Sequence, residues 1–375
     1  MTKELAITKT NNLIRGSKVG IYFGTFAPLH SGHQQEIYKA AALNDGVVVI
    51  VSGYTGDRGD NIDLGLQKRF RYLREAFADE PTIRVTYIDE TNIPRYPNGW
   101  EAWASELVSA VNESVIAEDN QQFTAYVGEA DYVEPLQKLT PDSWSVEMAN
   151  RQNIPISATK IRENPTKYWS QINRVFRRHF TKKVLVAGSA STGKSTLVRR
   201  LARSINAPFS EEYARTYAEQ SNIVDSELTV SDYFRIIQGQ YDANSDEIKS
   251  HGNNGIVFLD TDAIVTRVYA KLYLTKEQQD QLEPVFQDTI RNEKIDLILV
   301  IPPITTYVND NFRNMDWEES RQEFHDELMR QLEEFNLMHK VVVLDDMGNN
   351  QGFYDRYQHA LATVHEKTGV EMPQL

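Results

Sequence analysis

The sequence predicts an α/β protein with two domains, each built on a parallel β-sheet. From Lys18 onward, short apolar runs alternate with longer segments whose apolar residues recur at helical spacing. This alternation starts again at KKVLVAGSA, residues 182–190, after a basic stretch. The chain has 375 residues, which is more than one hydrophobic core usually supports and enough for two.

The first domain, residues 18–164, follows a short N-terminal extension, residues 1–17. Its predicted helices cover residues 34–44, 67–78 and 100–115. Its predicted strands are VGIYF (19–23), GVVVIVSG (46–53), IRVTYID (83–89), FTAYVGE (123–129) and SWSVEMA (143–149). Strands that alternate with helices predict a parallel sheet covered by helices on both faces.

The second domain, residues 183–375, begins with the strand in KKVLVAGSA. Its later predicted strands are GIVFLDTD (255–262), KIDLILVIPP (294–303) and KVVVLDD (340–346). Between the domains, NPTKYWSQINRVFRRHFTKK is basic and amphipathic, and we interpret residues 165–182 as a linker helix. A basic helix of this kind usually presents a solvated face.

The composition limits the possible functions. The net charge is −13 and the pI near 5.2, so the surface as a whole does not attract polyanions, and any nucleotide must be held by local positive groups and backbone amides. The absence of cysteine excludes disulfides and thiolate metal sites. No run reaches the roughly 20 apolar residues that span a bilayer. We therefore expect a soluble, cytoplasmic protein without membrane insertion.

The segment GSASTGKS, residues 188–195, matches the phosphate-binding pattern G-x-x-x-x-G-K-[ST], between an apolar strand and a helical pattern. Its glycines permit backbone conformations in which successive N–H groups converge on phosphate oxygens. Lys194 is expected to reach the β- and γ-phosphates of ATP, and the Ser195 hydroxyl to bind Mg²⁺. The predicted ATP contacts here are Gly188, Ser189, Ala190, Ser191, Thr192, Gly193, Ser195 and Thr196.

Acidic residues follow two of the strands in this domain. GIVFLD ends in Asp260 and Asp262, which could hold the metal or orient a hydroxyl, and Asp260 is our second predicted Mg²⁺ ligand. APFSEEYAR places Glu211 and Glu212 where another strand would end, which is where small-molecule kinases often bind the acceptor hydroxyl. Each acid could also be a solvated loop residue, and the sequence does not say which one is the base.

A polar segment after ILVIPP carries Arg313 and Arg321. Two arginines in a lid could close on the transferring phosphoryl group, as an arginine finger does. No guanine-reading NKxD is present, which argues against a GTPase. The second domain is therefore predicted to transfer phosphate from ATP to a small hydroxylated acceptor.

The first domain contains GTFAPLHSGH, residues 24–33, directly after its first strand. This segment puts His30 and His33 at the start of a helix, where backbone N–H groups and the helix dipole favour anions. The two imidazoles could stabilise an α-phosphate as its charge builds in a transition state. Taken alone, two histidines are more often surface or packing residues. Gly24, Thr25 and Phe26 complete the predicted ATP-binding loop.

This loop resembles the [HT]-x-G-H signature of the nucleotidyltransferase superfamily, found after the first strand of a Rossmann-like domain. A second signature of that superfamily, roughly I-S-[ST]-x-x-[IV]-R, resembles ISATKIR, residues 156–162. The resemblance implies that Ser157, Thr159 and Arg162 hold the β- and γ-phosphates of ATP and that pyrophosphate is a product. Hydroxyls and a guanidinium at a helix start suit that role.

Two further stretches belong to a predicted mononucleotide site. IPRYPNGWEAW places Tyr96, Asn98, Trp100 and Trp103 around an Asn-Gly turn, where an aromatic ring could stack on a flat cationic nicotinamide; these aromatics could equally be core residues. YVGEADYVEPL ends a strand with Gly128, Glu129 and Asp131, at the edge where adenosine would lie.

With both signatures in one chain, the sequence resembles the bifunctional NadR proteins, which fuse nicotinamide-nucleotide adenylyltransferase and ribosylnicotinamide kinase. The resemblance runs from about Lys18 to the C-terminus. It implies a Rossmann-like nucleotidyltransferase domain and a P-loop kinase domain, with ATP, nicotinamide riboside, nicotinamide mononucleotide (NMN) and NAD as ligands. It also implies a functional link to a riboside transporter and a riboside site of Glu211, Tyr213, Arg215 and Asp262 beside the catalytic Glu212 and Asp260.

Some members of that family begin with a DNA-binding helix-turn-helix. Seventeen residues precede Lys18, and with the negative net charge we expect no nucleic-acid binding. An alternative interpretation keeps the kinase and makes the first domain a sensor of NAD or NMN. The sequence does not fix the oligomeric state, and a homo-oligomer is possible. The loop at residues 347–357 is where adenine contacts of the kinase are sought.

Overall fold

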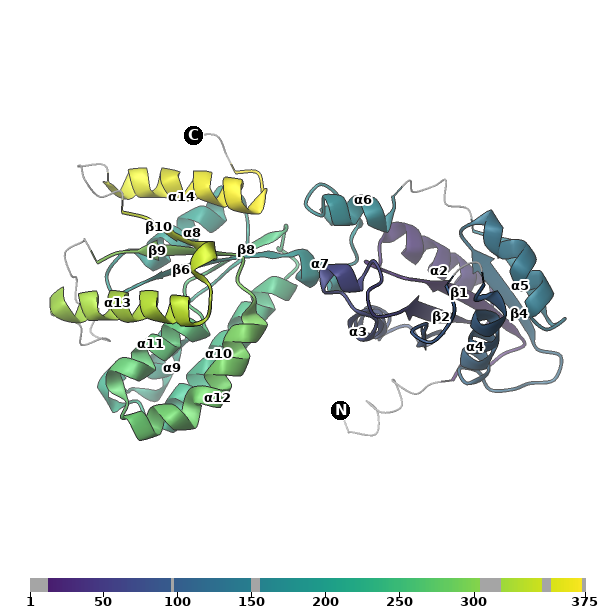
Figure 1. The fold of residues 1–375 in the computed structure, drawn as a ribbon, viewed down its shortest axis with the longest axis horizontal. Coiled ribbons are helices and arrows are strands. Elements are labelled where there is room, and N and C mark those ends of the chain that lie inside the picture. Colours follow the sequence, from purple (N-terminus) through teal and green to yellow (C-terminus); the bar gives the residue numbers. More distant parts are fainter. Residues whose placement is uncertain (1–12, 96–97, 150–155, 304–317, 346–351, 373–375) are drawn as a thin grey trace. The chain divides into compact units, whose positions relative to one another are not determined.

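Two parallel β-sheets organise the chain (Figure 1). The computed structural model describes residues 13–95, 98–149, 156–303, 318–345 and 352–372. The chain divides into two compact units, Met1–His179 and Phe180–Leu375, and each unit holds one five-stranded sheet. In the described part of the chain, no helix has the length and apolar character needed to cross a membrane.

The sheet of the first unit has the strand order β3-β2-β1-β4-β5, with every pair parallel. Its strands are β1 (Lys18–Gly24), β2 (Gly46–Gly53), β3 (Ile83–Asp89), β4 (Gln122–Val127) and β5 (Trp144–Met148). The predicted strands are thus confirmed. β2 is buried along its whole length, as its unbroken β-branched run indicates for an inner strand of a parallel sheet.

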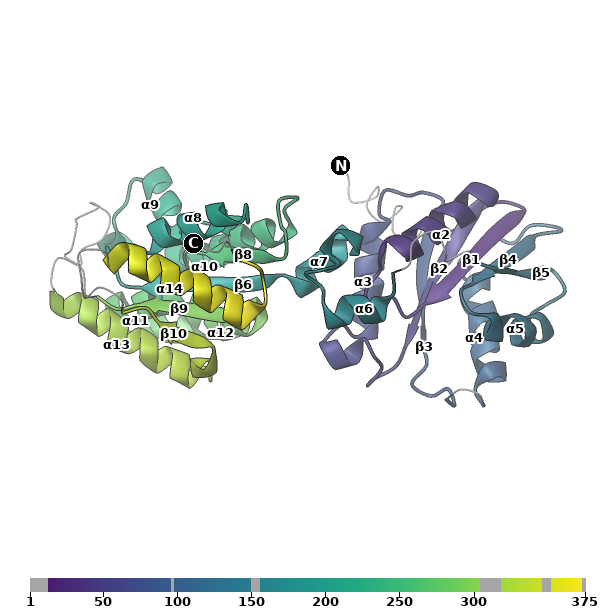
Figure 2. The ribbon, with the colours of Figure 1, turned by 90° about the horizontal axis from the view of Figure 1, so that it is seen from above.

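Helices cover both faces of this sheet (Figure 2). Their bounds are α2 (Ser31–Leu43), α3 (Leu66–Ala76), α4 (Trp100–Asn112) and α5 (Val133–Leu139). α2 and α3 pack on one face, while α4 and α5 pack on the other around Ile21, Leu107 and Leu136. The strand order changes direction between β1 and β4, so the loops that follow these two strands diverge and leave room for a ligand.

The predicted linker helix, residues 165–182, differs in the structure. It consists of a 3₁₀ turn at Trp169–Gln171, a break, and the short helix α7 (Arg174–Phe180). At the break, Ile172 is buried and bridges to His30, and the Asn173 N–H donates to the Leu29 carbonyl at 3.1 Å. The Asn173 side chain then accepts from the Val175 N–H at 2.9 Å and starts α7. Tertiary packing against the first unit therefore interrupts the helix.

The sheet of the second unit has the order β10-β9-β6-β8-β7, again all parallel. Its strands are β6 (Lys182–Gly188), β7 (Phe209–Ser210), β8 (Ile256–Leu259), β9 (Leu297–Ile301) and β10 (Val341–Val343). Each strand predicted for this domain is present. β6 lies in the centre, so the loop that follows it lies between the ends of β8 and β9.

Two helical layers enclose this second sheet. α8 (Lys194–Ser204) and α14 (Gly352–Thr368) share a core with alternate residues of the strands, such as Val186, Phe258 and Leu299. The residues between these, such as Leu185 and Val257, face the other layer. That layer contains α10 (Val230–Lys249), α11 (Ala263–Tyr273), α12 (Lys276–Glu293) and α13 (Glu318–Glu334), while α9 (Tyr213–Ser221) follows β7 and contacts α10.

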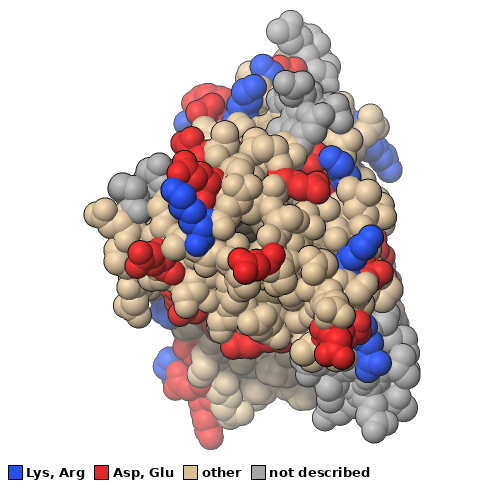
Figure 3. All heavy atoms as spheres, turned by 90° about the vertical axis from the view of Figure 1, so that its right-hand side faces the viewer, with Lys and Arg blue, Asp and Glu red and all other residues tan. Residues whose placement is uncertain are grey.

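The surface carries charges of both signs. Figure 3 shows Asp and Glu interspersed with Lys and Arg over the face turned to the viewer, and the described residues there form no continuous basic area. This agrees with the net charge of −13. That local positive groups and backbone amides hold a nucleotide stays a prediction.

Candidate active sites

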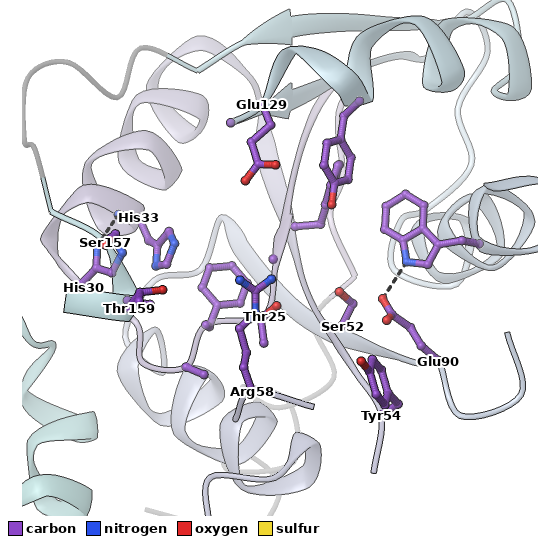
Figure 4. Close-up of a pocket in the computed structure, with 18 of the residues that line it drawn as sticks. Thr25, His30, His33, Ser52, Tyr54, Arg58, Glu90, Glu129, Ser157 and Thr159 are labelled. Atoms are coloured by element: carbon purple, nitrogen blue, oxygen red, sulfur yellow. Dashed lines mark hydrogen bonds between the residues drawn. The ribbon is translucent and has the colours of Figure 1, made fainter. Parts of the chain in front are cut away.

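A cavity of about 600 Å³ opens at the carboxyl ends of the strands in the first unit (Figure 4). It lies at the point where the strand order changes direction, which is the usual ligand site of an open α/β sheet. The following predicted residues line it: Gly24, Thr25, Phe26, His30, His33, Trp100, Trp103, Gly128, Glu129, Ser157, Thr159 and Arg162.

Two described residues that were predicted for the same site do not line the cavity. Asn98 lies in the turn before α4 and Asp131 in a short 3₁₀ turn after β4, and both side chains are exposed outside the cavity. Because these turns point the two residues toward solvent, the structure does not bring them to the site. Tyr96 lies outside the described residues.

The two histidines of the first signature lie together at the start of α2. His30 is the N-cap residue, and its Nδ1 accepts from the His33 N–H at 3.4 Å. The two imidazole rings stack, with centroids 3.7 Å apart and planes 20° from parallel. Both rings line the cavity beside a helix N-terminus, where the helix dipole favours an anion, so the two rings can serve one anion.

The second signature begins α6 (Ala158–Glu163) on the same side of the cavity (Figure 4). Ser157 is its N-cap and accepts from the Lys160 N–H at 3.3 Å. Arg162 donates to the Thr159 hydroxyl at 2.9 Å and to the Ala27 carbonyl at 2.8 Å, which ties α6 to the first signature. Burial, together with the charge of Arg58, lowers the pKa of Arg162, and the negative charge of a bound anion would oppose this lowering.

Aromatic residues form the opposite wall. Trp100 contacts Trp103 edge-on at 6.0 Å and Tyr132 at 5.1 Å between ring centroids. The Trp103 Nε1–H donates to Glu90 at 3.0 Å. Trp103 also belongs to the hydrophobic core of this unit and lines the cavity, which confirms the interpretation as a core residue, while stacking on a nicotinamide stays a prediction. Flat rings beside a carboxylate suit a flat, cationic ligand.

Sequence analysis missed several polar residues of the cavity. They come from the last residues of β2 and from the segments after β2, β3 and β4, and include Ser52, Tyr54, Arg58, Glu90, Arg95 and Tyr132. No motif marks them. A signal was nevertheless present, because residues just after neighbouring parallel strands meet at one edge of the sheet.

In the second unit, the predicted phosphate loop curls between β6 and α8. Three of its residues have positive φ: Gly188 at 158°, Ser191 at 58° and Gly193 at 88°. A Cβ on Gly188 would lie 2.6 Å from the Ile301 carbonyl oxygen, so this glycine is required. The buried Lys194 donates to the Ser189 carbonyl across the loop at 2.8 Å.

A residue of the last helix also supports this loop. Arg356, on α14, is buried and donates to the Thr192 carbonyl at 2.9 Å. It lines a small recess with Gly193, Thr196 and Phe353. Sequence analysis placed adenine contacts in the loop at 347–357, of which the structure describes residues 352–357.

The residues proposed for Mg²⁺ lie side by side. Asp260 directly follows β8 and is buried; its burial raises the pKa of the carboxyl, while the charge of Lys194 and a hydrogen bond from Ser195 lower it. One buried oxygen of Asp260 has no hydrogen-bond partner among the described residues. Two protein oxygens completed by phosphates and water match the way Mg²⁺ is usually held, so the residues fit the ion.

Glu211 and its neighbours begin α9 at the end of β7, as predicted. Glu211 is exposed and pairs with Arg199 at 2.8 Å, and Glu212 is the N-cap residue of the helix. The buried Gln240 holds this loop, since it accepts from the Tyr213 N–H at 2.7 Å and donates to the Glu211 carbonyl at 3.2 Å. Arg215 follows on the same helix.

Asp262 differs from the sequence prediction. Its buried carboxylate caps α11, where it accepts from the Val265 N–H at 3.0 Å. Burial raises the pKa of Asp262 to about 7, and it raises the pKa of the nearby buried Glu293 well above its usual value. Because its side chain points into the protein, the structure does not support a contact between Asp262 and an acceptor.

Asp262 gives the second unit a testable pH dependence. Its folded-state pKa lies above the value of about 3.9 in an unfolded chain, so the folded state binds more protons between these pH values. The free energy of unfolding should therefore fall as the pH rises from about 4 to 7. Asp262→Asn keeps the cap and should flatten this fall, as measured by calorimetry across that range. An unchanged slope, equal to that of the exposed control Asp288→Asn, would contradict the assignment.

The predicted lid is only partly described. Arg313 lies outside the described residues. Arg321 lies on α13 and is buried, on a helix whose Phe324 and Leu328 enter the core. From residue 318 onward the segment is therefore a packed helix, because its apolar residues recur at helical spacing, and Arg321 does not stand on an exposed loop.

Comparisons with known proteins identify the family of this chain. A family model described as AAA domain matches residues 183–349. The trifunctional NAD biosynthesis/regulator protein NadR of Salmonella typhimurium is 31% identical over 334 residues, which cover 86% of this chain and 78% of that protein. A solved NadR structure in complex with NR is 60% identical, with a TM-score of 0.90, over 97% of this chain and 100% of the other.

A second solved NadR structure, in complex with NAD and AMP-PNP, is 59% identical with a TM-score of 0.88. It also covers 97% of this chain and 100% of its own. The identity and coverage shared with the Salmonella relative extend over both units. The chain therefore belongs to the NadR family.

Proposed function

We propose that this chain is a bifunctional enzyme of NAD salvage, with a kinase in the second unit and an adenylyltransferase in the first. The observation that supports this best is that each unit carries its own phosphate-binding geometry at the carboxyl edge of its own sheet. The ligands named for the related structures, NR, NAD and AMP-PNP, are a nucleoside, a dinucleotide and an ATP analogue. These are the acceptor, product and donor classes that the two sites require.

In the second unit, the phosphate loop and Lys194 would hold ATP, with Mg²⁺ between the phosphates, Ser195 and Asp260. The ion would neutralise charge on the phosphates. The ribose 5′-hydroxyl of nicotinamide riboside would lie near Glu211 and Glu212, which follow the strand next to β8. Attack of this hydroxyl on the γ-phosphorus yields NMN and ADP.

In the first unit, the phosphate of NMN would attack the α-phosphorus of a second ATP and release pyrophosphate. His30 and His33 would stabilise the charge that develops on the α-phosphate, while Ser157, Thr159 and Arg162 hold the leaving phosphates. The wall of Trp100 and Tyr132 would receive the nicotinamide ring. The product is NAD.

Phosphorylation would retain the riboside inside the cell, which fits a cytoplasmic enzyme that works with a riboside transporter. The first test incubates the protein with nicotinamide riboside, ATP and Mg²⁺ and follows products by chromatography. We expect NMN to appear first and NAD to follow. If the reaction stops at NMN, even when NMN is supplied with fresh ATP, the first unit is a binding or sensing module and only the kinase assignment stands.

A further inference from the structure

The loop between β2 and α3 is built around a buried ion pair. The Arg69 side chain is fully buried and the Asp57 side chain is 6% exposed. They form two hydrogen bonds, from Nη1 to Oδ1 at 2.9 Å and from Nη2 to Oδ2 at 2.6 Å. Burying both charges costs desolvation free energy that their attraction repays only in such bidentate geometry, so stability alone gives little reason for the pair.

The Asp57 carboxylate also fixes the backbone on both sides of residue 58. It accepts from the Tyr54 N–H at 3.3 Å, the Gly59 N–H at 2.7 Å and the Asp60 N–H at 2.9 Å. Five hydrogen bonds therefore converge on one side chain. The backbone around position 58 can take few other paths.

The packing around Arg69 is equally tight. A Cβ on Gly53 would lie 2.1 Å from the Arg69 Nη2, and one on Gly59 would lie 1.7 Å from its Nη1. Both glycines are therefore needed for the guanidinium to reach Asp57. The loop and the helix α3 are fitted to each other at this point.

The residue that this loop presents is Arg58, which lines the cavity. In the view of Figure 4, its side chain appears between the group of His30, His33, Ser157 and Thr159 and the group of Ser52, Tyr54 and Glu90, and all of these residues line the same cavity. Its charge is close enough to Arg162 to lower the pKa of that residue. Arg58 thus stands between the proposed ATP phosphates and the proposed nicotinamide pocket, where the phosphate of the mononucleotide would lie.

From these contacts we infer that the buried Asp57–Arg69 pair positions Arg58 to hold the attacking phosphate in the first unit. Asp57 and Arg69 do not touch the substrate in this arrangement; they act through Arg58. The inference rests on the proposed function, because it takes NMN as the ligand of the cavity.

A double-mutant cycle tests it. Arg58→Ala should lower kcat/KM for NMN by about 100-fold, as for loss of one charged contact to a phosphate, and Arg58→Lys should restore part of this. Arg69→Lys keeps the buried charge but loses the bidentate contact, and we expect kcat/KM for NMN to fall about tenfold. If Arg69 acts through Arg58, Arg69→Lys should lower kcat/KM for NMN by less than about twofold when Arg58 is already alanine.

The control is Arg178→Met, which breaks a second bidentate pair of helix α3. In this pair, Arg178 of α7 donates to Glu75, which lies on α3 as Arg69 does. Arg178→Met should leave NAD formation unchanged. Equal costs of Arg69→Lys in both backgrounds would overturn the inference and make the pair a general structural element. Asp57→Asn provides a second route to the same cycle if Arg69→Lys fails to fold.

The Kd for NMN is measured by calorimetry for the same set of variants. If the wild type binds NMN but forms no NAD, the proposed adenylyltransferase activity fails while the binding cycle still decides the role of the pair. If the wild type does not bind NMN, both are overturned.

Discussion

Lys194→Ala is expected to lower the rate of NMN formation from nicotinamide riboside by about 10³-fold. The ammonium group is buried at the start of α8 and donates to the Ser189 carbonyl, so it stands where the β- and γ-phosphates would lie. Its loss removes a positive charge whose attraction for the phosphates would be strongest in the transition state. The measurement is the initial rate of NMN formation at saturating ATP.

This variant should leave NAD formation from supplied NMN at the wild-type rate, because that site lies in the other unit. Lys276→Ala is the control, since its side chain is exposed and pairs only with Asp280 among the salt bridges described for it. A Lys194→Ala protein that retains more than about a tenth of the kinase rate would show that phosphate is held elsewhere.

His33→Ala is expected to lower NAD formation from NMN by about 10² to 10³-fold. Its ring stacks on His30 beside the helix N-terminus and lines the cavity, so it can donate to the α-phosphate as charge develops there. Most of the effect should appear in kcat, because the contact strengthens in the transition state. Rates are followed as NAD appears, and the kinase rate in the same sample reports on the integrity of the rest of the chain.

His179→Ala serves as the matched control, since it removes an imidazole from the same unit that does not line the cavity. If His33→Ala raises KM for ATP without lowering kcat, the residue binds the ground state only. Such a result would assign the transition-state role to other donors of the cavity.

Much of the fold was predictable from the sequence, because its signals are local. The β2 run GVVVIVSG holds five consecutive β-branched apolar residues, Val47–Val51, which few structures other than an inner strand accommodate. The phosphate loop, the histidine signature and ISATKIR each combine spacing with a strand or helix boundary. Their positions in the structure follow from sequence order alone.

The remaining features depend on contacts between distant residues. Ile172 interrupts the predicted linker helix because it pairs with His30, which lies more than a hundred positions earlier. Asp262 follows a strand as Asp260 does, but the start of α11 turns its side chain inward. Gln240 and Arg356 are single polar residues on helices, and only the tertiary structure brings them to their loops. Spacing rules do not describe such contacts.

The close fit of Gly53 and Gly59 against Arg69 has an evolutionary consequence. A larger residue at either glycine would meet the guanidinium, so neither position can change while Arg69 remains. Loss of Arg69 alone frees neither glycine, because a Cβ on Gly53 would still lie 2.3 Å from the Asp57 Oδ2 and one on Gly59 would lie 2.8 Å from the Leu64 carbonyl oxygen. Gly53 should therefore vary among homologues only where Asp57 and Arg69 have both changed, with substitutions that arrive together along single branches, while Gly59 stays glycine.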